Sequence, residues 1–352
     1  MTEEEKAFRN IYRSKYYGLS ERLVGENAKY ILKNESDLEI INFDDEFLIK
    51  INDNEYQWEG IVPNEGKLTR VRMSKKEGIV HYLEKQKIKS KNNSLIKNSN
   101  LIIPFSYIGG NNEIIKNEYG CSPKGEIKLG KNDKNERIYD IKFQNINSNT
   151  AEFHFEGELK NKCNMDWVIN LTNEEIESLI PSDFKTNKAF FNKTANNIIK
   201  EYDKEHKDDV IKVPDVVKIG KWIKKNIKYD IRYTGMNHLT AFDTLNDKRG
   251  VCHHFTKLFN ALMYALGYPV LYALGFAMTN KNSFGIEDSF CWSLINLDKK
   301  GLKWTPFDAT FGIFSGKLPV THVFKQIGNK RALFLSYDNA DMEPPYIQGR
   351  ID

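Results

Sequence analysis

The stretch DKRGVCHHFTKLFNALMYALGYP, residues 247–269, carries the pattern that decides the fold of its part of the chain. Its apolar residues recur at steps of three and four, which is typical of one face of an α-helix. They are Phe255, Leu258, Phe259, Leu262, Met263 and Leu266. Cys252 lies three residues before the first of them and extends the same face. Gly267 and Pro269 predict the end of the helix, since glycine and then proline commonly follow a last helical turn.

Cys252 therefore stands at the start of a helix that is predicted to be buried. Unpaired backbone N–H groups and the helix dipole favour a thiolate at this place, which suits a nucleophile. A second interpretation is that Cys252 is a small apolar residue at the end of a core helix, because free cysteines are often buried. Gly250 is expected to let the chain turn sharply into the helix.

The composition is that of a folded protein with a nearly balanced charge. The 352 residues include 52 basic and 48 acidic side chains, which leave a net charge of +4. This balance gives no electrostatic reason to expect a nucleic-acid or membrane partner. No apolar run approaches the roughly 20 residues that span a bilayer. The first residues, MTEEEKAFRN, lack the apolar core of a signal peptide, so we expect a cytoplasmic protein if this N-terminus is native.

The four cysteines do not predict a metal site. They are Cys121, Cys163, Cys252 and Cys291. No pair has C-x-x-C spacing and no histidine follows at finger-like spacing, so we expect neither structural zinc nor another cofactor.

The pattern of apolar residues divides the chain into three parts. Residues 1–37 are predicted to form a helical segment. Residues 38–170 contain short alternating runs separated by Gly, Asn, Asp and Ser, which predict an antiparallel β-domain. Residues 171–352 are predicted to form an α+β domain, in which the cysteine helix packs on an antiparallel sheet.

Four motifs in this last part occur in an order that resembles a known family. They are WIKKNIKYDIRYT (222–234), the Gly-x-Cys helix start, a strand with Trp292, and WTPFDAT (304–310). Together they resemble the transglutaminase-like core, a papain-like cysteine fold, over about residues 212–312. The resemblance implies that Cys252 is the nucleophile and Asp308 the acid that orients a histidine. Tyr229 and Asp230 match a family position near the cleft, although a helix end packed on the sheet explains them equally well.

The family's histidine usually lies two residues before the tryptophan, and here Phe290 occupies that position. We expect Phe290 to face the cysteine helix and Cys291 to face away, because successive strand residues alternate. Cys252 would then be a protonated, weakly nucleophilic thiol. Without an imidazole to orient, Asp308 is expected to bind backbone N–H groups.

The other histidines give no clear replacement for the missing base. His253 and His254 follow Cys252 directly, and neighbouring positions on a helix point to different faces, so their rings are not expected to reach the thiol. His238 and His322 lie in other segments, and either could approach Cys252 in the folded chain.

Two interpretations of function remain. The first is a transglutaminase-like protein that is inactive or severely weakened and binds a protein or peptide. The second is an active cysteine protease, amidase or transglutaminase that uses a displaced histidine. Loss of one member of a catalytic triad typically costs several orders of magnitude in rate, which favours the first.

Overall fold

The structure is a computed structural model that places most, but not all, of the chain. The residues it describes are 39–40, 47–50, 56–62, 67–73, 77–92, 95–96, 98–104, 112–131, 137–144, 148–162, 167–169, 171–207, 213–277, 283–298, 303–314, 316, 318, 321–328, 333–336 and 340–351. The helical segment predicted for residues 1–37 lies outside them.

The chain divides into two compact units that interleave along the sequence. The first unit contains residues 1–77, 163–273 and 290–320, and the second contains residues 78–162, 274–289 and 321–352. Each unit is therefore assembled from separate stretches, whereas the pattern of apolar residues suggested three consecutive domains.

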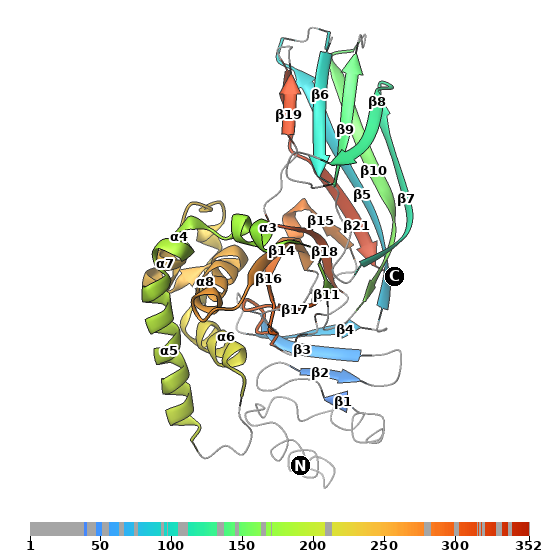
Figure 1. Ribbon diagram of the computed structural model, residues 1–352. Coiled ribbons are helices and arrows are strands. Elements are labelled where there is room, and N and C mark those ends of the chain that lie inside the picture. Colours follow the sequence, from blue (N-terminus) through green and yellow to red (C-terminus); the bar gives the residue numbers. More distant parts are fainter. Residues whose placement is uncertain are drawn as a thin grey trace. The chain divides into compact units, whose positions relative to one another are not determined.

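The helices of the first unit surround the predicted cysteine helix, α8 (Figure 1). They are α3 (Asn173–Leu179), α4 (Ser182–Thr186), α5 (Lys188–Glu205), α6 (Asp215–Asn226), α7 (Ala241–Asp247) and α8 (Cys252–Ala265). Helix α8 packs against α5, α6 and α7. Phe255, Leu258, Phe259, Leu262 and Met263 are at most 1% exposed, as the periodicity predicted. Burial of each such side chain stabilises the fold by about 1.5–3 kcal/mol.

The end of α8 also follows the prediction. Gly267 has a φ of 86°, in the left-handed region that glycine adopts without strain. Its N–H donates to the carbonyl of Tyr264, and the N–H of Tyr268 donates to the carbonyl of Met263. These two bonds form the glycine-terminated cap that satisfies carbonyls of the last turn.

An antiparallel sheet lies against the helical layer. Its order is β11 (Trp167–Val168), β17 (Lys303–Phe307), β16 (Ser289–Ile295) and β14 (Val270–Ala277), and the path continues to β18 (His322–Ile327). Strands β16 and β17 pair with Ser293 opposite Phe307. Ile295 and Phe307 belong to the same buried cluster as the apolar face of α8. This arrangement confirms the expected α+β class with the cysteine helix on an antiparallel sheet.

A separate meander in the first unit consists of β1 (Glu39–Ile40), β2 (Phe47–Lys50), β3 (Tyr56–Val62) and β4 (Lys67–Met73).

The second unit is built from antiparallel strands. One sheet has the order β15 (Ser283–Gly285), β21 (Tyr346–Ile351), β5 (Glu77–Ser90), β10 (Thr150–Lys162) and β7 (Asn112–Ser122), and β20 (Ala340–Met342) also pairs with β5. The other has the order β19 (Leu333–Ser336), β6 (Asn98–Pro104), β9 (Arg137–Gln144) and β8 (Glu126–Lys131). The C-terminal strand β21 pairs with β5 along its whole length. Antiparallel strands are present in the described part of residues 38–170, but those of residues 39–73 belong to the first unit, and the second unit also contains C-terminal strands.

Candidate active site

A short parallel strand pair leads the chain into α8. Strands β12 (Lys228–Tyr229) and β13 (Arg249–Gly250) place Tyr229 beside Gly250. The N–H of Asp230 donates to the carbonyl of Gly250 at 2.9 Å. Because Gly250 lies two residues before Cys252, this pairing fixes the position of the thiol relative to Tyr229.

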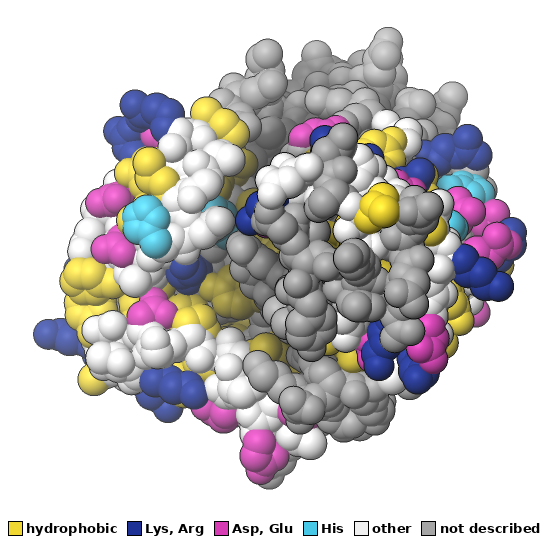
Figure 2. All heavy atoms as spheres, turned by 90° about the horizontal axis from the view of Figure 1, so that it is seen from above, with side chains coloured by type: hydrophobic (Ala, Val, Ile, Leu, Met, Phe, Trp, Pro, Cys, Tyr) yellow, Lys and Arg dark blue, Asp and Glu magenta, His cyan; other side chains and the backbone are white. Residues whose placement is uncertain are grey.

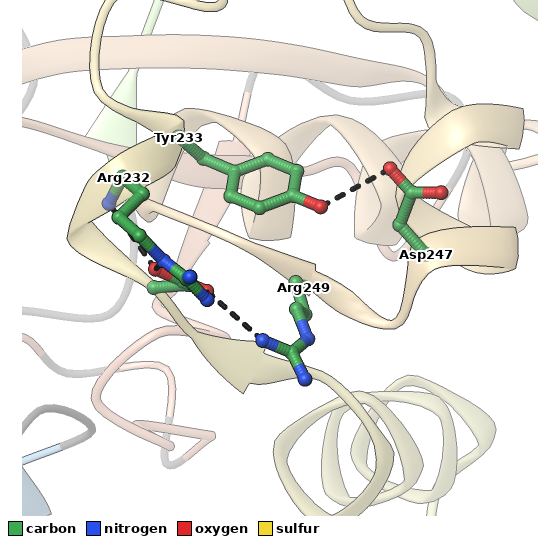
Figure 3. A network of polar contacts seen from close by, with 5 residues as sticks. Arg232, Tyr233, Asp247 and Arg249 are labelled. Carbon is green, nitrogen blue, oxygen red and sulfur yellow. Dashed lines mark hydrogen bonds and ion pairs between the residues drawn. The ribbon is translucent and has the colours of Figure 1, made fainter.

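Asp230 anchors this approach through charge (Figure 3). Its carboxylate accepts from Nε and Nη2 of Arg232 at 2.9 and 2.7 Å, and from Nη1 of Arg249 at 3.3 Å. The hydrogen bonds from Arg232 hold the pKa of this carboxyl well below its usual range. The hydroxyl of Tyr233 donates to Asp247 at 3.3 Å, which joins the loop to the end of α7. Asp230 is thereby a structural residue of the approach to the thiol.

Position 250 has no room for a side chain, because His254 lies directly beside it. A Cβ atom at this position would lie 2.4 Å from Cβ of His254, a distance that real Cβ contacts do not reach. Its φ is not among the positive angles of the chain, so the close approach of His254 explains the glycine better than the sharp turn we expected.

His254 is buried and locked in its neutral form. Its Nδ1 accepts from the N–H of Val251 at 3.1 Å, and its Nε2 lies 3.1 Å from the carbonyl of Met236. An imidazole that accepts at Nδ1 and donates at Nε2 carries one proton. Burial and the nearby charge of His253 lower the pKa of His254 to about 4. His254 therefore clamps the loop before α7 to the first turn of α8.

Cys291, expected to face away from the helix, lies against it. Its thiol donates to Oγ1 of Thr256 at 3.5 Å, and the hydroxyl of Thr256 donates to the carbonyl of Cys291 at 3.1 Å. Thr256 is one helical turn after Cys252, so Cys291 lies against the face of α8 that carries Cys252. The expectation failed because residues 291–295 of β16 are all buried, so alternation alone did not show which face meets α8.

The pKa of the Cys252 thiol is lowered to about 6. The largest cause is the hydrogen bond from Cys291, and the hydrogen bond and positive charge of His253 act in the same direction against the effect of burial. Burial raises the pKa of Cys291 well above its ordinary value, and the charge on Cys252 adds to this effect. Cys252 is thus the thiolate and Cys291 the protonated donor, which reverses our expectation of a protonated Cys252.

His253 contributes to the lowered pKa of Cys252, although the spacing along the helix gave no reason to expect its ring near the thiol. Cys252 is the first residue of α8 and follows an extended Val251, with φ −113° and ψ −177°. The rule that adjacent helical residues diverge applies less strictly there, since no earlier turn constrains the side chains. The rings of His253 and His254 lie with their centroids 3.8 Å apart and their planes tilted by 38°.

Tyr229 adds a hydroxyl near the two thiols. Its ring lies 6.2 Å from that of Phe255. Burial raises the pKa of Tyr229, and the negative charge of Cys252 raises it further. The hydroxyl therefore remains protonated and able to donate.

Asp308 and Phe290 form a second group beside the site. Oδ1 of Asp308 accepts from the N–H groups of Thr310 and Phe311 at 2.8 and 3.0 Å, which agrees with the expectation that it binds backbone N–H groups. The Asp308 side chain is fully buried. The ring of Phe290 lies 5.0 Å from that of Phe311 in the same turn. The structure thus brings Phe290 to the turn that holds Asp308.

The two alternative histidines belong to other segments. His238 is exposed in the loop before α7. His322 belongs to the second unit, where its carbonyl accepts from Nδ2 of Asn161 at 3.1 Å. Within the described ranges, no three His, Cys, Asp or Glu side chains are grouped so that they could hold a metal ion.

Comparison with known proteins relates part of this chain to a known superfamily. Residues 196–309 match the family model of the transglutaminase-like superfamily. A candidate cysteine protease from Cytophaga hutchinsonii has a similar structure over 78% of this chain and 91% of its own, with 18% identity and a TM-score of 0.51. Two matches are more distant. A transglutaminase covers 54% of this chain and 45% of its own, with 15% identity and a TM-score of 0.26. A candidate protease from Parabacteroides distasonis covers 78% of this chain and 68% of its own, with 10% identity and a TM-score of 0.24. A search of curated proteins found no match.

The helix, the sheet and the thiol site define a papain-like α+β core. Residues 196–309 of this chain are a transglutaminase-like superfamily core. None of the helices described in the structure is long and apolar enough to cross a membrane. On the face shown in Figure 2, basic and acidic side chains lie interspersed, in keeping with the small net charge.

Proposed function

We propose that this core is a thiol-dependent acyl-transfer enzyme, a peptidase or amidase, in which Cys252 is the nucleophile and His253 the base. One observation carries the proposal: the pKa of the Cys252 thiol is lowered to about 6, chiefly through its interaction with Cys291 and then with His253 and its positive charge. A thiolate at neutral pH is the species that attacks a carbonyl carbon.

The chemistry needs a proton carrier and a site for the developing oxyanion. The thiolate of Cys252 adds to the carbonyl carbon, and His253 then donates its proton to the leaving amine as the thioester forms. The first N–H groups of α8 have no partner inside the helix and point toward its N-terminus, where they can donate to the oxyanion. The hydroxyl of Tyr229 is a further candidate donor. Water or an amine then releases the acyl group.

Turnover is expected to be slow. Asp308 uses Oδ1 to bind backbone N–H groups, and the position from which the family's histidine would contact it holds Phe290. An imidazole without an orienting carboxylate loses up to about 10⁴-fold in rate in serine enzymes, and we expect a penalty of similar kind for His253.

The test uses an activated ester and follows both product and enzyme. p-Nitrophenyl acetate should give a burst of nitrophenol and an acetyl group on Cys252, found by peptide mass mapping. The burst should disappear in Cys252→Ala and fall by at least about 10²-fold in His253→Gln, the low end for general acid–base catalysis. His238→Gln is the matched control and should leave the burst unchanged. A full burst in His253→Gln would exclude His253 as the base.

A second function is supported by Phe290. An apolar ring at the usual base position, beside an acid bound to backbone groups, is what an inactive relative that binds a protein or peptide would show. For that function we expect no acylation of Cys252. Calorimetry with a peptide library should detect peptide binding, and the Cys252→Ala variant should bind with the same affinity. Acylation of Cys252 would argue against it.

A further inference from the structure

A second cysteine, Cys291 of β16, lies against the helix α8 that begins with Cys252. Acyl transfer by Cys252 does not require this second thiol. Cys291 is 2% exposed and lies on β16, whereas Cys252 is half-buried on α8. Thr256 ties Cys291 to the face of α8 that carries Cys252, through the bonds of 3.5 and 3.1 Å described above. The two sulfur atoms are therefore held together by two separate elements, one accessible and one shielded.

We propose that Cys252 and Cys291 form a site of reversible oxidation by hydroperoxides, in which a disulfide between them blocks the nucleophile. The proposal rests on the same reactive thiol as the proposed function, but it does not require that an acyl group is transferred. Hydrogen peroxide is the simplest oxidant of this class.

The oxidation proceeds in two balanced steps. The thiolate of Cys252 attacks one oxygen of hydrogen peroxide, the O–O bond breaks, and a sulfenic acid and water form once the leaving hydroxide is protonated. The sulfur of Cys291 then attacks the sulfur of Cys252, its proton passes to the departing hydroxide, and a disulfide and a second water form. In total, the two thiols lose two electrons and two protons, and peroxide is reduced to water.

The structure assigns a different part to each cysteine. The half-buried Cys252 meets the oxidant first, and its low pKa gives the thiolate that reacts. Thr256, one helical turn after Cys252, holds the thiol of Cys291, so the attacking sulfur already lies on the face of α8 that carries Cys252. Formation of the bond releases the contact with Thr256 and removes the nucleophile, and a thiol reductant restores both.

The experiment exposes the purified full-length chain to hydrogen peroxide, blocks the remaining thiols with iodoacetamide, and digests the protein without reduction. Trypsin places Cys252 in peptide 250–257 and Cys291 in peptide 282–299, so a bond between them joins two separate peptides. We expect this joined species, a loss of alkylated Cys252, and its full recovery after dithiothreitol. In Cys291→Ala, Cys252 should instead proceed to the sulfinic acid, which dithiothreitol does not reverse. Cys121→Ala is the matched control and should behave as the unmodified protein.

Two results would overturn the inference. In the first, Cys252 is alkylated rapidly but oxidises to the sulfinic acid while Cys291 stays free. This result would keep Cys252 as a reactive thiol and refute the disulfide with Cys291. If Cys252 reacts with neither peroxide nor iodoacetamide, the reactive thiol itself is refuted, and the proposed function falls with it.

Discussion

Replacing Cys291 with alanine tests which group lowers the pKa of Cys252. The hydrogen bond from Cys291 is the largest cause of the lowered value of about 6. A hydrogen bond to a charged group contributes about 1.5–3 kcal/mol, and about 1.36 kcal/mol corresponds to one pKa unit. We therefore expect the pKa of Cys252 to rise by about 1–2 units in Cys291→Ala.

The assay is the rate of alkylation of Cys252 by iodoacetamide, measured on its tryptic peptide from about pH 5 to 9, a range that brackets both expected midpoints. At the acidic end the variant should react more slowly, because less of its thiol is ionised. At the basic end the order should reverse, since a thiolate of higher pKa is intrinsically more nucleophilic, by about 3-fold per unit. A crossing of the two profiles distinguishes a changed pKa from a change in access.

The control for this experiment is Cys121→Ala. Cys121 lies in the second unit, where its sulfur accepts from the N–H of Gly125 at 2.9 Å, and its loss should leave the profile of Cys252 unchanged. An unchanged midpoint in a folded Cys291→Ala would refute the role of Cys291. His253 would then have to account for the whole effect.

Three further changes test other parts of the site. Phe290→His should raise ester hydrolysis by about 10²-fold, the low end for acid–base catalysis, whereas an unchanged rate in the folded variant would show that position 290 does not reach Cys252. His254 has its pKa lowered from 6.5 to about 4, so its neutral form stabilises the fold above pH 6.5 and this contribution is lost as the pH falls toward 4. That contribution is at most about 3 kcal/mol, and urea unfolding of His254→Gln should show a correspondingly weaker pH dependence; equal slopes in both proteins would contradict the assignment. Asp230→Asn should lower the urea midpoint, because two arginines lose their shared partner, and a midpoint equal to that of the unmodified protein would show that this network does not hold the approach to α8.

The sequence by itself determined the elements whose signals are local. The spacing from Phe255 to Leu266 specified α8, and Gly267 specified its end, because helix periodicity and a left-handed cap depend only on neighbouring residues. The order of the four motifs was sufficient to indicate the transglutaminase-like core, and the alternating runs indicated antiparallel strands. The backbone hydrogen bonds of Asp308 could also be predicted from the sequence, because the N–H groups that donate to its carboxylate lie only two and three residues further along the chain.

Only the tertiary structure decided the chemistry around Cys252. Cys291 meets α8 because β16 is buried on both faces, and a strand covered on both faces carries no alternation that tells one face from the other. The ring of His253 lies beside that of His254, which hydrogen bonds with Val251 and Met236 hold in place. The pKa of Cys252 depends on these contacts between segments that are distant in the sequence. The spacing of apolar residues predicts the secondary structure of each segment, but the charge of a thiol depends on the groups that tertiary packing places next to it.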